Sequence, residues 1–216
     1  MIKFGAFSFL KYASLVVFVM WQGAAESDYA LRIMARFFLR STDWKELVYA
    51  KQASVLLAGL SHNSWNHLFS NLSSLMALAD LEQLIGSRKV AHIFLGGTIF
   101  GALASCLWYK GSSQNLGASD GIMALHSYSL LILGPRREVR ILIGGSKIRV
   151  NVLVYLCLLL ASEALGLLGN FSGKDQRDRT NYAAHLGGAL WGVLFHLFEM
   201  ATKMNQSAQE KKESPP

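Results

Sequence analysis

Long stretches without charged residues constrain this chain more than any other feature of its sequence. Residues 52–79, 90–109 and 180–198 contain no Asp, Glu, Lys or Arg, and the runs 111–135 and 150–173 contain one such residue each. A helix of about 20 apolar residues crosses the hydrocarbon core of a bilayer. The sequence therefore predicts six membrane-spanning helices, at approximately residues 4–24, 66–84, 90–109, 119–134, 150–169 and 182–200.

Composition agrees with a membrane protein and argues against a soluble one. Hydrophobic residues make up 52% of the chain and charged residues 16%, below the roughly 25% charged residues of soluble domains. The net charge of +7 is spread over short loops between the apolar runs, so we expect a lipid bilayer as the partner and no nucleic acid. The fold class that follows is an all-α, polytopic bundle, with a weak preference for a cytosolic N-terminus because slightly more Lys and Arg fall on that side.

The loop after the first predicted span, residues 25–61, is unusually long. Arg32, Arg36 and Arg40 recur every four residues, with apolar residues largely around the other side. This pattern predicts a helix lying in the headgroup plane, or an amphipathic helix packed on its own bundle. We take residues 1–202 as one membrane domain and the polar residues 203–216 as a disordered tail.

Polar residues inside the predicted spans are the candidates for function, because burying them in a membrane is costly. His67 and Asn71 share one helix face, Ser119 begins the fourth span, and His185 begins the sixth. All three spans start on the same side of the membrane, so these residues can converge. Each alone has a structural explanation as an interhelical hydrogen-bonding residue, but together they supply a nucleophile, a base and donors for acyl transfer. No His or Cys cluster suggests a metal, and we expect no cofactor.

Several motifs resemble those of the rhomboid intramembrane serine proteases. The resemblance covers residues of about 60 to 200 and is strongest around the candidate nucleophile and base, where it is closest to the mitochondrial, presenilin-associated branch. The residues that carry it are His62, His67 and Asn71, the pair Glu82 and Gly86, the run Gly117-Ala118-Ser119, and the run Ala184-His185-Leu186-Gly187-Gly188.

The resemblance implies a mechanism and a setting. Ser119 would be the nucleophile and His185 the base of a dyad without a third, acidic member. His67 and Asn71 would stabilise the oxyanion, and supporting positions would be His62, Gly117, Asp120 and Gly188. Small residues on the sixth span, including Gly188 and Gly192, would let the fourth span approach closely. The substrates implied are single-span membrane proteins, and the branch suggests the mitochondrial inner membrane.

Asp120 departs from the family pattern, which has glycine directly after the nucleophile. An ionised Asp120 would favour the imidazolium form of His185 and repel the oxyanion, so we expect Asp120→Gly to raise turnover. Two functions stay open: an active protease, and a catalytically inactive rhomboid-like protein that serves a translocon or binds membrane clients in quality control. The presence of Ser119 and His185 together with His67 and Asn71 favours the protease, since a scaffold has no physical need for all four.

Overall fold

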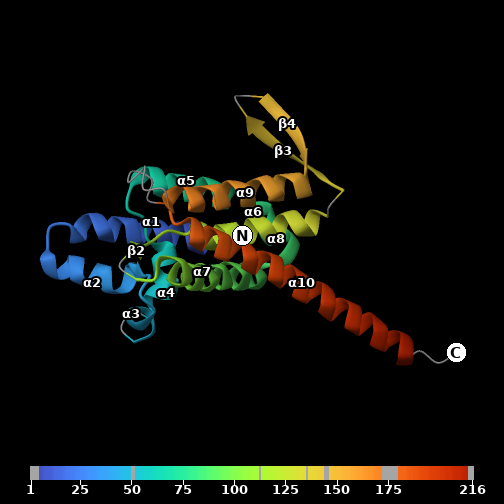
Figure 1. The fold of residues 1–216 in the computed structure, drawn as a ribbon, viewed down its shortest axis with the longest axis horizontal. Helices are drawn as coiled ribbons and strands as arrows, with labels where there is room; N and C mark the ends of the chain where they lie inside the picture. Colours follow the sequence, from blue (N-terminus) through green and yellow to red (C-terminus); the bar gives the residue numbers. More distant parts are fainter. Residues whose placement is uncertain are drawn as a thin grey trace.

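The long helices of the chain lie beside one another in a bundle (Figure 1). The structure, a computed structural model, describes residues 5–49, 52–111, 113–134, 136–143, 146–171 and 180–213. The long helices are α1 (Ala6–Ala24), α5 (Trp65–Ala77), α7 (Ser87–Tyr109), α8 (Ser119–Leu133), α9 (Val152–Phe171) and α10 (Tyr182–Glu213). The shorter elements are α2 (Asp28–Phe38), β1 (Arg40–Ser41), α3 (Trp44–Tyr49), α4 (Ser54–Leu57), η1 (Ala58–Leu60), α6 (Ala79–Ile85), β2 (Gln114–Asn115), β3 (Glu138–Ile143) and β4 (Ser146–Asn151).

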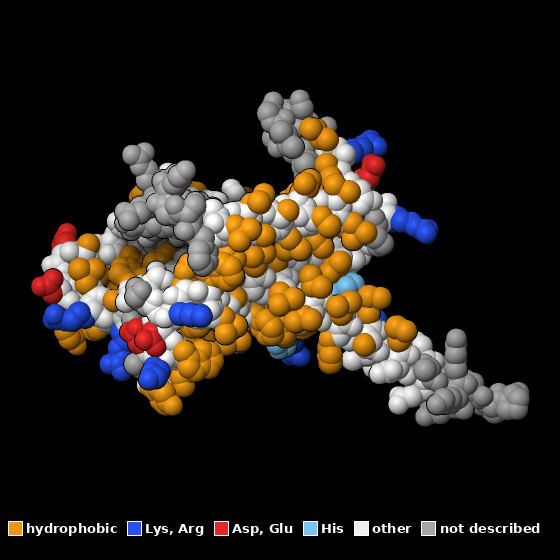
Figure 2. Space-filling model, in the orientation of Figure 1, with side chains coloured by type: hydrophobic (Ala, Val, Ile, Leu, Met, Phe, Trp, Pro, Cys, Tyr) orange, Lys and Arg blue, Asp and Glu red, His pale blue; other side chains and the backbone are white. Residues whose placement is uncertain are grey.

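The surface divides along the bundle as expected for a membrane protein. Figure 2 shows a mostly hydrophobic middle, with charged side chains gathered near α2 and α3 at one end and near the β3–β4 hairpin at the other. In the described part of the chain, three helices are at least 18 residues long and apolar enough to cross a membrane, namely α1, α7 and residues Val152–Gly169 of α9. The count of six spans stays a prediction, because α5 has only 13 residues and α8 only 15.

Three local expectations differ from the structure. The second predicted span is two helices, α5 and α6, which separate at Leu78, where ψ is 2°. The loop before the fifth span contains an antiparallel hairpin, β3–β4, which pairs Glu138 with Asn151 and delays the start of α9 to Val152. The tail expected to be disordered is helical as far as Glu213, because residues 203–213 are mostly good helix formers such as Lys, Met, Gln and Glu. The division of the chain into a membrane domain and a tail stays a prediction.

Glu82 and Gly86 occupy the helix end that the sequence indicated. Oε1 of Glu82 accepts a hydrogen bond from the backbone N–H of Ala6 at 2.5 Å, so this carboxylate caps the start of α1. Gly86 follows α6 with φ of 81°, a conformation that favours glycine. Glu82 therefore joins α6 to the first helix, and Gly86 forms the turn between α6 and α7.

Helix α8 is packed closely between α7 and α10 through small residues on both neighbours. A Cβ added to Gly97 of α7 would lie 2.6 Å from Cβ of Ala124. On α10, a Cβ at Gly188 or Gly192 would overlap the backbone carbonyl oxygens of Asp120 and Ala124, respectively. Interior packing leaves little room for such additions, so these glycines set the distance between the helix that begins with Ser119 and the helix that carries His185.

The first loop returns to the bundle through a short strand pair. Helix α2 is amphipathic and packs Met34 into a cluster with Val17 and Ala24 of α1, as one of the two alternatives for this segment predicted. Arg40 lies beyond α2, where β1 pairs it with Asn115 of β2. Its side chain is 3% exposed, so the expectation that Arg40 belongs to a headgroup-facing stripe is wrong: β-pairing turns this residue into the protein.

Candidate active site

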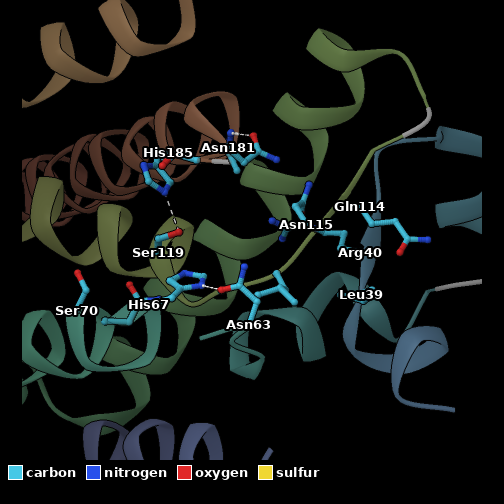
Figure 3. Close-up of a pocket in the computed structure, with 15 residues that line it drawn as sticks. Leu39, Arg40, Asn63, His67, Ser70, Gln114, Asn115, Ser119, Asn181 and His185 are labelled. Carbon is cyan, nitrogen blue, oxygen red and sulfur yellow. Dashed lines mark hydrogen bonds between the residues drawn. The ribbon is translucent and has the colours of Figure 1, made fainter. Parts of the chain in front are cut away.

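A cavity of about 570 Å³, lined mostly by residues with polar side chains, lies where α5, α8 and α10 begin (Figure 3). It brings together the four residues expected to act in chemistry, namely Ser119, His185, His67 and Asn71. Its other lining residues come from the first loop, the start of α5 and the turn before it, β2 and the residues after it, and the start of α10. They are Leu39, Arg40, Asn63, Ser70, Gln114, Asn115, Leu116, Gly117, Thr180, Asn181 and Ala184.

Ser119 and His185 are hydrogen-bonded across the α8–α10 interface. Oγ of Ser119 lies 2.8 Å from Nε2 of His185, and the two side chains face each other in Figure 3. Ser119 is the first residue of α8, and His185 lies in the first turn of α10. Asn181 caps that turn by accepting the N–H of Ala184 at 2.9 Å, and its Nδ2 donates to Oγ of Ser105 on α7 at 3.0 Å. The start of α10 is thus fixed to α7 while its glycines admit α8.

The other ring nitrogen of His185 is also hydrogen-bonded. Nδ1 lies 2.8 Å from Oε2 of Glu163, a residue of α9, and each of these two side chains is 15% exposed. An ionised carboxylate only accepts, so with Glu163 ionised the proton of a neutral imidazole lies on Nδ1, and Nε2 accepts the hydroxyl hydrogen of Ser119. Geometrically, the serine and histidine belong to a chain of three residues from three helices.

His67 faces the nucleophile segment from α5. Ser64 begins this helix by accepting the backbone N–H of His67 at 3.3 Å, and Nδ1 of the His67 ring lies 3.1 Å from Oδ1 of Asn63. Gly117 has φ of 122°, and a Cβ there would lie 2.7 Å from Nε2 of His67. A larger residue at 117 would meet both backbone strain and the imidazole, so Gly117 is what lets His67 approach the residues before Ser119.

Asn71 is oriented by His62. Nδ2 of Asn71 lies 2.8 Å from Nε2 of His62, which is buried in the turn between η1 and α5. Burial, and secondarily the nearby charge of His67, lower the pKa of His62 from 6.5 to about 4, so its ring is neutral at pH 7 and accepts an Asn71 N–H. An amide nitrogen has two N–H groups, and Asn71 therefore keeps a second one while lining the cavity.

Asp120 does not sit as a free charge beside the nucleophile. Its Oδ2 accepts a hydrogen bond from Nη2 of Arg40 at 2.6 Å, and its Oδ1 accepts the backbone N–H of Gly121 at 2.8 Å. The side chain is 1% exposed and packs against Gly101 of α7. Arg40 also donates to the carbonyl of Thr98 at 3.0 Å. Arg40 thus compensates the charge of Asp120 inside the protein, which weakens the electrostatic effect of Asp120 on His185 and the oxyanion that the sequence led us to expect; that effect stays a prediction.

Comparison with known proteins gives the family. Residues 50–201 match the family model of the rhomboid domain, which is more than half of the chain. The chain belongs to the rhomboid family. It is 30% identical over 141 residues to a rhomboid-like protein 11, chloroplastic, of Arabidopsis thaliana, which covers 63% of this chain and 49% of that protein. It is 26% identical over 200 residues to a rhomboid protein 1, mitochondrial, of Saccharomyces cerevisiae, which covers 86% of this chain and 52% of that protein. The chain thus spans about half the length of these curated relatives.

Three residues of this rhomboid site were not predicted from the sequence. Glu163 had a usable signal, because it is the lone charged residue of the fifth predicted span, and such residues mark function or need a partner. Asn181 had a weaker one, as an Asn directly before a helix. Arg40 had none, because its contact with Asp120 depends on the pairing of β1 with β2, two strands 73 or more residues apart in sequence.

Proposed function

We propose that this rhomboid family member is an intramembrane serine endopeptidase that cleaves single-span membrane proteins with Ser119 and His185. The observation that carries the proposal is the 2.8 Å hydrogen bond between Ser119 Oγ and His185 Nε2 inside a polar cavity of a membrane bundle. A serine and a histidine joined in this way, with further donors beside them, form an arrangement suited to acyl transfer. No metal or cofactor enters the mechanism.

The first half of the proposed reaction forms an acyl-enzyme. Ser119 Oγ attacks the scissile carbonyl carbon while Nε2 of His185 takes the hydroxyl proton. The tetrahedral intermediate then collapses: the carbon–nitrogen bond breaks, and the imidazolium returns the proton to the leaving amine. In the second half, His185 deprotonates a water that attacks the ester carbonyl, and Ser119 is released with its hydroxyl restored.

The proposed oxyanion site uses donors that surround the start of α8. Asn71 supplies one side-chain N–H group, and the backbone N–H of Ser119 belongs to the unsatisfied first turn of the helix. His67 supplies a further N–H only from Nε2, the ring nitrogen near Gly117, because its Nδ1 faces Oδ1 of Asn63. The helix dipole adds a partial positive charge at the same point. Preorganised donors of this kind are each worth about 2.7–4 kcal/mol of barrier, and His62 and Gly117 would hold them in place.

We assign the substrate class and the compartment by similarity. Single-span membrane proteins fit a cavity that opens at the end of a membrane bundle, where the end of a substrate helix can unwind toward water. A relative named as mitochondrial aligns over 86% of this chain, which supports a mitochondrial membrane as the location.

The deciding experiment is covalent labelling of the purified protein in detergent with a fluorophosphonate, combined with cleavage of a single-span reporter in proteoliposomes. We expect the wild type to be labelled and to cut the reporter, and Ser119→Ala to do neither. Ser129→Ala is the matched control. It removes a hydroxyl from the same helix, ten residues further on, where Oγ donates a hydrogen bond to the backbone carbonyl of His126. It should label and cut like the wild type.

Two results would reverse the proposal. Labelling that persists in Ser119→Ala would exclude this residue as the nucleophile. A folded wild-type protein that neither reacts with the probe nor cuts any single-span reporter would favour the alternative function, an inactive rhomboid-like protein that binds membrane clients.

A further inference from the structure

Glu163 is an ionisable residue in an apolar helix with a specific partner. It is the single Asp, Glu, Lys or Arg in α9, Val152–Phe171, and several of its neighbours along the helix, including Leu158, Leu165 and Leu168, are exposed. A carboxylate is costly in such a segment unless it is paired. Its partner is Nδ1 of His185 at 2.8 Å, on the same ring whose Nε2 lies 2.8 Å from Ser119 Oγ.

Helix α9 is shaped to bring this carboxylate to the histidine. Gly166 lies one turn after Glu163, and a Cβ there would overlap the ring of Tyr182 at the start of α10. Tyr182 in turn makes an edge-on contact with the His185 ring, with 6.2 Å between centroids. The missing side chain at 166 therefore sets how closely α9 approaches the turn that carries His185, and with it the Glu163–His185 distance.

We propose that Glu163 is a positioning residue that extends the Ser119–His185 pair to a hydrogen-bonded triad. It fixes the imidazole tautomer with the proton on Nδ1, which leaves the Nε2 lone pair for the Ser119 proton, and it stabilises the imidazolium that forms when that proton moves. The proton stays on the imidazole and is returned to the leaving amine, so Glu163 remains ionised throughout. This inference rests on the proposed protease function.

The competing explanation is that the pair only ties α9 to α10. A tie would affect stability, whereas a positioning carboxylate changes the rate of the chemical step and the tautomer of His185. Glu163→Gln separates the two, since the amide has nearly the same size but no charge and can present an N–H instead of an acceptor to Nδ1. We expect kcat to fall by roughly 10²–10⁴-fold and KM to stay within about twofold.

A second pair of variants tests the geometry through Gly166. Gly166→Ala should push Tyr182 and α9 apart and lower kcat in the wild-type background, but add little in the Glu163→Gln background because the contact is already lost. Gly169→Ala is the matched control on the same helix, where an added Cβ meets nothing within 4 Å. Glu138→Gln, at an exposed carboxylate of β3, controls for loss of one negative charge.

The NMR signal of the His185 Nδ1 proton separates failure of this inference from failure of the proposed function. In ¹⁵N-histidine-labelled protein, we expect a strongly downfield Nδ1–H resonance in the wild type, absent in Glu163→Gln and His185→Ala and present in Glu138→Gln. If the wild type is inert but shows this signal, the Glu163–His185 hydrogen bond stands and the protease proposal fails. If Glu163→Gln matches Glu138→Gln in kcat, or if the wild type lacks the downfield proton, Glu163 has no positioning role.

Discussion

Substitution of Asp120 tests how a carboxylate is accommodated next to a nucleophile. Asp120→Asn preserves the size of the side chain and an oxygen for the N–H of Gly121, but removes the charge that faces Arg40. The guanidinium would then be buried with hydrogen bonds to Thr98 and Asn115 and no anionic partner. We expect the variant to be less stable, and turnover to fall, because Arg40 and Asp120 together hold the first loop against the start of α8.

The burial of the pair decides the size of the effect. The two side chains are 3% and 1% exposed, and their charged atoms are 2.6 Å apart. Exposed ion pairs contribute about 0–1 kcal/mol, whereas removing one partner of a buried pair typically costs about 3–5 kcal/mol because the remaining charge is uncompensated. We therefore expect Asp120→Asn and Arg40→Met each to lower the free energy of unfolding by about 3–5 kcal/mol.

A double-mutant cycle in mixed detergent micelles measures this interaction. The free energies of unfolding of Asp120→Asn, Arg40→Met and the double variant are compared, and the double variant should be less destabilised than the sum of the singles by at least about 2 kcal/mol. Arg32→Met, at an exposed position of α2, should stay within about 0.5 kcal/mol of the wild type. A loss below about 1 kcal/mol in Asp120→Asn, together with faster turnover, would show that Asp120 acts as an unpaired charge and refute the reasoning.

The remaining predictions concern packing and pH. Gly188→Ala should lower the free energy of unfolding by about 1–3 kcal/mol and reduce reporter cleavage, because the added Cβ would meet the rigid backbone carbonyl of Asp120. Gly23→Ala is the control, because a Cβ there meets nothing within 4 Å. It should show neither loss in the same thermal unfolding and cleavage assays. The pKa of His62 is lowered to about 4 in the folded protein, against 6.5 when unfolded, so the neutral form is favoured by folding. The resulting stabilisation, about 3 kcal/mol at most, is complete above pH 6.5 and is lost as the pH falls toward 4. In pH-dependent unfolding, His62→Gln should flatten the curve over that window, and an unchanged slope would show that His62 titrates normally in the fold.

The membrane architecture was the most predictable part of the fold. The thickness of the hydrocarbon core requires a minimum length of apolar helix, and the apolar sequence runs of α1, α7 and α9 reach that length. Two features could not be predicted in this way: the break between α5 and α6 at Leu78, and the β3–β4 hairpin. The break at Leu78 lies within a continuous apolar run, so neither periodicity nor the charge count indicates that the helix ends there. The hairpin lies where a short loop between two spans was expected, and nothing in the charge count indicates paired strands.

Convergence of Ser119, His185, His67 and Asn71 could be predicted because alternate spans of a bundle begin on the same side of the membrane. The approach of α8 to α10 could also be predicted, since small residues such as Gly188 and Gly192 permit contact between helix backbones. The hydrogen-bond and ion-pair partners of the site residues could not be predicted. Whether Asp120 faces His185 or Arg40 depends on rotation of α8 and on the β1–β2 pairing, and neither leaves a pattern in a single sequence.

The position of His185 depends on two separate helix contacts of this bundle, one with α8 and one with α9. Its Nε2 reaches α8 because Gly188 and Gly192 admit that helix, and its Nδ1 reaches α9 because Gly166 admits the ring of Tyr182. The two contacts differ in how firmly they are held: α8 lies between α7 and α10, whereas α9 exposes much of its apolar surface. A displacement of α9 would therefore break the Glu163–His185 contact while leaving the Ser119–His185 hydrogen bond in place. Conditions that loosen α9, such as thinner bilayers or smaller detergent micelles, should accordingly reduce the activity of the wild type more than that of Glu163→Gln, because the variant has already lost that contact.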